Sequence, residues 1–195
     1  LFKTSLEKSL FSSPAACIKS IEARLKKLYK KYTADDIKDI HLLENLKTAL
    51  EAITPADFTR YQKLLDLLKS KEYAWNPADS GDRVVIFTER IETMKYLAER
   101  LRQDLGLKAN AIQEISGGMS DAEQQRIVED FGRTESSVRV LVASDVASEG
   151  LNLHYLSHRL IHFDIPWSLM VFQQRNGRID RYGQQKRPDI RYMLI

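Results

Sequence analysis

The stretch VRVLVAS, residues 138–144, is apolar at nearly every position and runs directly into the polar sequence SDVASEGLNL, residues 144–153. A run that is apolar on consecutive positions is typical of a strand buried on both faces of a sheet. Similar short runs recur as VVIFT (84–88), AIQEI (111–115), RLIHFD (159–164) and DIRYMLI (189–195). Helical spacing fills the intervals, over about residues 91–104, 121–131 and 168–179. Strands that alternate with helices predict an α/β fold, with a parallel sheet flanked by helices on both faces.

The chain before residue 75 has a different periodicity, in which apolar residues recur every three or four positions. This spacing predicts three amphipathic helices, over about residues 14–32, 35–53 and 54–68. Ser13 and Pro14 are typical of a helix start, whereas Pro77 and Gly81 indicate a loop. We therefore expect an all-helical segment over residues 1–75 and an α/β lobe over residues 76–195.

Composition narrows the class of protein. The 195 residues are 43% hydrophobic and 29% charged, which suits a globular domain with an appendage. The net charge of +3 is too small to indicate nucleic-acid binding by itself. Cys17 is the only cysteine, which favours a reducing, cytoplasmic location, and no apolar run reaches membrane-spanning length. The chain begins at Leu1 rather than Met, so we expect it to be part of a longer protein.

Polar residues follow the predicted strands at the edge where open parallel sheets bind ligands. Thr88 ends the first strand, and Gly117 and Gly118 follow the second. The glycine pair precedes a helix capped by Ser120 and Glu123, so its backbone N–H groups could hold a phosphate. An ordinary tight turn explains the same pair.

The segment QQRNGRIDRYGQ, residues 173–184, places three arginines at intervals of three. On a helix this spacing brings the guanidinium groups near one face, where each like-charged pair costs a few tenths of a kcal/mol. A bound anion would explain the arrangement, although a solvated helix face is the simpler alternative. Gly177 inside a helix would cost about 1 kcal/mol relative to alanine, which indicates close approach of another backbone or of a ligand.

Four motifs in a fixed order carry a family resemblance: VVIFTE (84–89), ISGGMS (115–120), SDVASEGLNL and QRNGRIDRYGQ (174–184). Together they resemble the second RecA-like lobe of superfamily-two helicases and translocases. The linking sequence FDIPWSLMVFQQRNGRIDRYGQ is most similar to the Swi/Snf-like branch, which includes the bacterial ATPases that recycle RNA polymerase. The resemblance covers about residues 82–195.

The resemblance implies that ATP binds between this lobe and an N-terminal RecA-like lobe. Arg178 and Arg181 would then be arginine fingers on the γ-phosphate, acting with Gln174 as catalytic residues. The remaining nucleotide site would comprise Asp145, Gly150, Asn152, Arg175 and Gly177. Asn176 departs from the family pattern, in which an apolar or small residue is more usual.

The same resemblance implies a track for nucleic acid, most simply double-stranded DNA, whose phosphates would meet Thr88, Gly117, Gly118 and Ser144. The sequence contains no G-x-x-x-x-G-K-[ST] loop and no acidic box, so Mg²⁺ and its ligands are expected in the N-terminal lobe. The alternatives are a non-catalytic binding module on a RecA-like fold and, among enzymes, an RNA-directed helicase.

Two further features are expected to be structural. His154, His158 and His162 are spaced by four, but His162 falls in a predicted strand, so no metal site is expected. Trp75 and Trp167 are interpreted as packing residues.

Overall fold

The computed structural model describes residues 2–30, 33, 36–145, 153–154 and 157–194. Within it the chain divides into two units, Leu1–Thr59 and Arg60–Ile195. Each unit has its own core, and each is described by itself.

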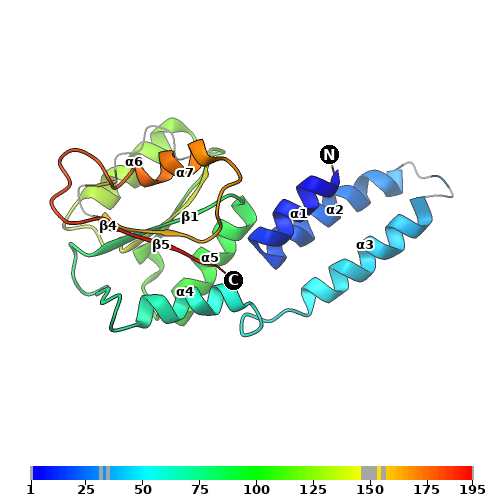
Figure 1. Cartoon of the computed structure of the whole chain (residues 1–195), viewed down its shortest axis with the longest axis horizontal. Coiled ribbons are helices and arrows are strands. Elements are labelled where there is room, and N and C mark those ends of the chain that lie inside the picture. The colour runs from blue at the N-terminus through cyan, green and yellow to red at the C-terminus, as the bar shows by residue number, and fades with distance from the viewer. Residues whose placement is uncertain (1, 31–32, 34–35, 146–152, 155–156, 195) are drawn as a thin grey trace. The chain divides into compact units, whose positions relative to one another are not determined.

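The first unit consists of three helices: α1 (Phe2–Ser12), α2 (Pro14–Lys30) and α3 (Asp36–Glu51) (Figure 1). The Ser13 hydroxyl accepts a hydrogen bond from the backbone N–H of Ala16 at 3.1 Å, which confirms the predicted helix start. The sequence did not predict α1, because its buried residues are the serines Ser9 and Ser12 rather than an apolar stripe. The hydroxyl oxygens of Ser9 and of Ser20 on α2 lie 2.6 Å apart, within hydrogen-bond distance.

Helix α4 (Thr59–Lys69) starts at the division between the units, and its side chains pack within the second unit. The Tyr61 hydroxyl donates to Asp104 Oδ2 at 2.6 Å, and the Tyr61 ring contacts the edge of the Tyr96 ring. The division therefore precedes α4, whereas the sequence placed α4 with the helical segment ending at residue 75. An apolar helix face indicates that a helix has a packing partner but does not identify it.

The second unit is built on a parallel sheet with strand order β2-β3-β1-β4-β5. The strands are β1 (Arg83–Thr88), β2 (Ile112–Ile115), β3 (Val140–Ser144), β4 (Ser157–His162) and β5 (Asp189–Tyr192). The connecting helices are α5 (Ile91–Asp104), α6 (Asp121–Gly132) and α7 (Leu169–Asn176), with a short 3₁₀ turn at Ala109–Ala111. Helices α6 and α7 lie on one face of the sheet, and α4 and α5 lie on the other (Figure 1). The predicted parallel α/β fold is confirmed.

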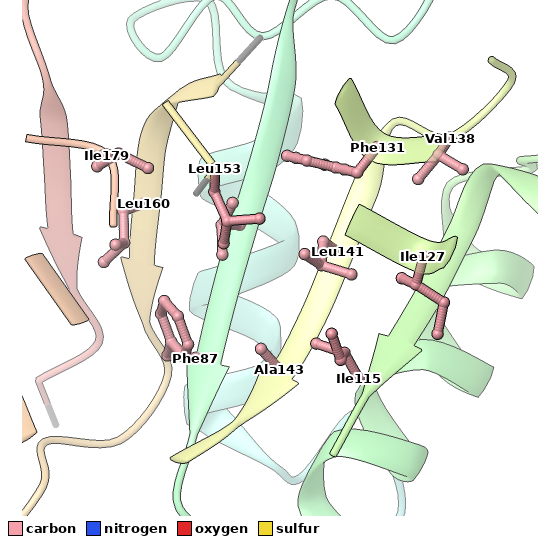
Figure 2. Close-up of a cluster of buried hydrophobic side chains, with 11 residues drawn as sticks. Phe87, Ile115, Ile127, Phe131, Val138, Leu141, Ala143, Leu153, Leu160 and Ile179 are labelled. Carbon is pink, nitrogen blue, oxygen red and sulfur yellow. The ribbon is translucent and has the colours of Figure 1, made fainter. Parts of the chain in front are cut away.

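The central strand β1 is buried along its whole length, which explains its uninterrupted apolar run. Val85 and Phe87 belong to a cluster with Ile127 and Phe131 of α6 (Figure 2). Leu153 and Ile179 join the same cluster from the segments after β3 and α7. These two side chains therefore anchor the chain at residue 153 and the arginine-rich segment to the sheet.

A buried ion pair holds the connection between α4 and β1. Arg159 of β4 donates from Nε to Asp82 Oδ1 at 2.7 Å, and its guanidinium lies 4.6 Å from the centre of the Tyr73 ring. Trp75 is buried and donates from its indole N–H to the carbonyl of Asp82 at 3.0 Å. The prediction that Trp75 is a packing residue is confirmed.

Candidate functional site

The carboxyl ends of three neighbouring strands meet around one carboxylate, that of Asp164. Thr88 at the end of β1 is paired with Ser144 at the end of β3, and Asp164 follows β4 by two residues. The Thr88 hydroxyl donates to Asp164 Oδ2 at 2.6 Å, and the backbone N–H of Glu89 donates to Asp164 Oδ1 at 2.8 Å. Asp164 therefore ties the end of β4 to the end of β1.

Arg175 of α7 is fully buried beside this carboxylate. Its Nε donates to Asp145 Oδ1 at 2.5 Å and its Nη1 to the carbonyl oxygen of Asp164 at 2.8 Å. A second ion pair joins Nη2 to Asp164 Oδ1 at 3.6 Å, and the guanidinium lies 5.6 Å from the centre of the Phe87 ring. A buried guanidinium is stable only with such partners, so Arg175 links the ends of β3 and β4 to α7.

Two carboxylates near Arg175, those of Asp145 and Glu89, have raised pKa values, mainly because they are partly buried. Burial raises the pKa of Asp145, and the hydrogen bond from Arg175 opposes that change. Burial also raises the pKa of Glu89, and the nearby charges of Asp164 and Asp145 raise it further. The backbone N–H of Trp167 donates to Glu89 and acts in the opposite direction. The strand ends thus form an acidic frame around the single guanidinium of Arg175.

The arginine-rich segment is helical only at its start. Helix α7 ends at Asn176, Gly177 is its C-cap with φ of −63°, and residues 178–181 form a turn. The predicted helix to residue 179, with three arginines on one face, is therefore wrong. A Cβ at Gly177 would lie 3.5 Å from the Gln173 carbonyl oxygen, an ordinary contact, so no close approach within the described chain requires glycine there.

The backbone of this turn is held by contacts that Asn176, Arg178 and Ile179 make with the rest of the lobe. Asn176 Oδ1 lies 2.7 Å from His162 Nε2, and Ile179 is fully buried in the core. The backbone N–H of Leu153 donates to the Arg178 carbonyl at 3.3 Å. Arg178 is half-buried and Arg181 is exposed, so the turn presents these two guanidinium groups on an anchored backbone.

Gln184 closes the segment at its far end. Its side-chain amide donates to the carbonyl oxygens of His154, Ser157 and Ile179, at 3.2, 2.9 and 3.0 Å. The role of Gln184 was not predictable from local sequence, because its partners lie up to 30 residues away. Gln174, which was predicted to be catalytic together with Arg178 and Arg181, is half-buried on α7.

The remaining predicted residues lie at the same edge of the sheet or outside the described residues. Gly117 and Gly118 form an exposed turn after β2, and the Ser120–Glu123 capping box that follows is confirmed. Ser144 is buried, and its hydroxyl has no hydrogen-bond partner among the described residues. Gly150 and Asn152 lie outside the described residues.

No role was predicted for Asp164, and His162 was considered only as a metal ligand. Both lie in RLIHFD, which was interpreted only as a strand. The rule that ligands bind beyond the carboxyl ends of strands would have selected Asp164, because β4 ends two residues before it.

Trp167 is 62% exposed, so the interpretation of this residue as a packing residue is wrong. It lines a surface hollow of about 480 Å³ with Ile165, Pro166, Leu169, Phe172, Tyr192 and Leu194. In the part of the chain that the structure describes, no group of His, Cys, Asp and Glu could hold a metal ion. None of the helices in this part is long and apolar enough to cross a membrane.

Comparison with known proteins identifies relatives of this chain. Residues 59–183 match the family described as the helicase conserved C-terminal domain. The RNA polymerase-associated protein RapA of Vibrio campbellii is 32% identical over 132 residues, which are 68% of this chain and 12% of that protein. The chain thus spans about 12% of the length of the curated relatives it matches.

Two solved structures share the fold. The C-terminal part of the Fun30 ATPase domain aligns with a TM-score of 0.57 at 19% identity, covering 86% of this chain and 52% of that chain. The Pyrococcus furiosus Hef helicase domain aligns with a TM-score of 0.58 at 21% identity, covering 93% of this chain and 36% of that chain.

Proposed function

The chain belongs to the helicase conserved C-terminal domain family, and on that premise we propose that it is the second motor lobe of an ATP-driven nucleic-acid translocase. The observation that carries the proposal is the anchored turn after α7. Arg175, Asn176 and Ile179 hold its backbone, and the turn carries Arg178, which is half-buried, and Arg181, which is exposed. We propose that these two arginines are the fingers that contact the γ-phosphate.

Two fixed guanidinium groups suit phosphoryl transfer because the negative charge on the phosphoryl oxygens must be stabilised in the transition state. An anchored backbone lowers the cost of holding the arginines in place as the reaction proceeds. Arg175 has a different position from its neighbours, since its donors face Asp145 and Asp164 inside the lobe. We propose that Arg175, expected from the resemblance to bind nucleotide, instead supports the residues that do.

The residues of this lobe fit ATP phosphates but not Mg²⁺. The half-buried carboxylate of Asp145 is bound to Arg175, and the buried carboxylate of Asp164 is bound to Thr88. We therefore propose that the phosphate loop and the carboxylates for Mg²⁺ come from an N-terminal RecA-like lobe. Gln174 and Gly177 flank Arg175 and Arg178 in sequence and are proposed to complete the nucleotide side of the site.

The track for nucleic acid is proposed to run along the exposed edge at the ends of β2 and β3. Gly117 and Gly118 offer exposed backbone beside the N-terminus of α6, which favours a phosphate. Thr88 and Ser144 are buried below this edge, so we propose that they support the track rather than touch it. Asp145, with Gly150 and Asn152, is proposed to connect the track to the nucleotide. Double-stranded DNA is the proposed substrate, RNA is the alternative, and the proposed location is the cytoplasm.

The test uses a protein that carries both lobes, with Arg178→Ala and Arg181→Ala as separate variants. Each should lower ATP turnover by roughly 10³–10⁵-fold, because a finger binds the transition state more tightly than the ground state. Nucleotide affinity should change little. Arg178→Lys should rescue poorly, since an ammonium group cannot reproduce the planar guanidinium fork.

The same variants test the binding-module alternative. Turnover within tenfold of wild type for both alanine variants would refute the finger assignment. If turnover persists while DNA binding is lost, the arginines grip nucleic acid instead. Stimulation of turnover by duplex DNA and by RNA, measured side by side on wild-type protein, separates a translocase on DNA from an RNA-directed helicase.

A further inference from the structure

His162, the last residue of β4, is fully buried and has a partner on each ring nitrogen. Nδ1 lies 3.3 Å from Arg175 Nη1, and Nε2 lies 2.7 Å from Asn176 Oδ1. A guanidinium can only donate, so Nδ1 must be the acceptor and Nε2 must carry the proton that is donated to Asn176. The contacts therefore fix a single neutral tautomer.

Two aromatic side chains also pack against the same ring. The His162 ring stacks on Phe172 at a centroid distance of 4.9 Å and an interplanar angle of 22°. It also stacks on Tyr192 at 5.1 Å and 18°. A ring that is held by both nitrogens and by stacking contacts has little freedom to turn, so it can serve as a fixed reference point for α7.

Asn176 is the last residue of α7, and the turn that carries Arg178 and Arg181, called here the arginine turn, follows it. Its carbonyl oxygen accepts hydrogen bonds from the backbone N–H groups of Ile179 at 3.2 Å and Asp180 at 3.0 Å. The backbone N–H of Arg178 in turn donates to the Arg175 carbonyl at 3.1 Å. His162 thus binds the side chains of the two residues, Arg175 and Asn176, whose carbonyls form the start of the turn.

We propose that His162 is a positioning residue that acts through Asn176 to orient the turn bearing Arg178, an inference that rests on the proposed function. An apolar residue at position 176 could not accept the proton of Nε2, so the pair gives this lobe a directional contact at this point. A displacement of about 1 Å at a catalytic group can cost roughly 100-fold in rate, so such a contact matters more for turnover than for folding.

The test compares His162→Phe, Asn176→Leu and the double variant in the two-lobe protein. Phenylalanine keeps the stacking but removes both ring nitrogens. Each single variant should lower kcat by roughly 10- to 100-fold, with the nucleotide Kd within threefold of wild type. The double variant should be no slower than the slower single variant, because both substitutions break the same hydrogen bond. His162→Gln, whose amide can donate and accept, should recover part of the rate.

His158→Phe is the matched control, because His158 is a half-buried histidine on the same strand. For each variant, kcat is divided by the fraction of protein that is folded at the assay temperature, which is taken from the thermal melting curve and its Tm. The proposal is overturned if kcat stays within threefold of wild type, if its loss follows the loss of folded protein, or if the two substitutions act additively. Should His162→Phe fail to fold, Asn176→Leu alone decides, because Asn176 is only half-buried.

Arg178→Ala separates this proposal from the proposed function. If Arg178→Ala is inactive and His162→Phe is normal, only the positioning role is overturned. If Arg178→Ala retains turnover, Arg178 is not a finger and the positioning role is overturned; if Arg181→Ala retains turnover as well, the finger assignment falls too.

Discussion

Replacing Arg175 by methionine should destabilise the α/β unit strongly while leaving its fold class intact. The guanidinium is fully buried. The substitution would remove the donor at 2.5 Å from the Asp145 carboxylate, the donor at 2.8 Å from the Asp164 backbone carbonyl, and the ion pair at 3.6 Å with the Asp164 carboxylate. Methionine fills most of the volume, so the main cost is two carboxyl groups deprived of their cation. Removing one partner of a buried ion pair typically costs about 3–5 kcal/mol.

This magnitude is large enough to measure in the 195-residue chain. For a unit of the size of Arg60–Ile195, 1 kcal/mol corresponds to roughly 3–4 °C, so Tm should fall by about 10–20 °C. Thermal melting followed by circular dichroism, together with urea titration, gives the change in unfolding free energy. Adding Asp145→Asn to Arg175→Met should recover part of the loss, because it neutralises one of the abandoned carboxylates.

Arg181→Met is the matched control, because Arg181 is exposed in the same segment. We expect it to change the unfolding free energy by no more than about 0.5 kcal/mol. If Arg175→Met lowers Tm no more than Arg181→Met does, Arg175 is not held between the two carboxylates. A direct role in nucleotide binding, as the resemblance implied, would then be the better assignment.

Two further predictions concern stability. Burial lowers the pKa of His162 to about 4 from 6.5, so its neutral form stabilises the fold fully above pH 6.5, and this contribution is lost as the pH falls towards 4. The loss should be about 3 kcal/mol. Because the raised pKa values of Asp145 and Glu89 act in the opposite direction, the unfolding free energy of His162→Phe should be subtracted from that of wild type at each pH. A difference that does not vary between pH 7 and 4 would contradict the prediction. Second, a chain lacking residues 1–75 should melt well below one lacking residues 1–59, since only the former loses Tyr61, Leu64 and Leu68 of α4. Burial of these side chains contributes about 1.5–3 kcal/mol each, and equal Tm values for the two truncations would show that α4 is dispensable.

The parallel sheet was predictable from the sequence because its strands are buried on both faces. In β1 and β3 every described position is buried, and uninterrupted apolar runs leave little choice of structure. The capping box at Ser120 was equally readable, since both partners lie within one turn of helix. Helix α1 was missed because its fully buried residues are serines. The sequence did not reveal that α4 packs in the second unit, because packing partners are set by the tertiary fold.

The arginine turn could not be predicted, because contacts distant in sequence end the helix before Gly177. Asn176 binds His162, which is 14 residues away, and Arg175 binds Asp145, which is 30 residues away. Spacing alone treats Arg175, Arg178 and Arg181 as equivalent, since it carries no information about which side chains will meet carboxylates. The roles of these residues stay predictions, but the structure distinguishes Arg175, which is buried, from Arg178, which is half-buried, and Arg181, which is exposed.

The positions of the three arginines also explain how the chain limits the repulsion among their positive charges. On one helix face their charges would repel one another at close range, but Arg175 lies inside the lobe against Asp145 and Asp164. Its charge is neutralised there, so it adds little repulsion to Arg178 and Arg181. Lysine could not replace it, because three separate nitrogens of the planar group reach His162, Asp145 and Asp164 in different directions. The position of Arg175 between two carboxylates thus allows three arginines within seven residues without three like charges on one face.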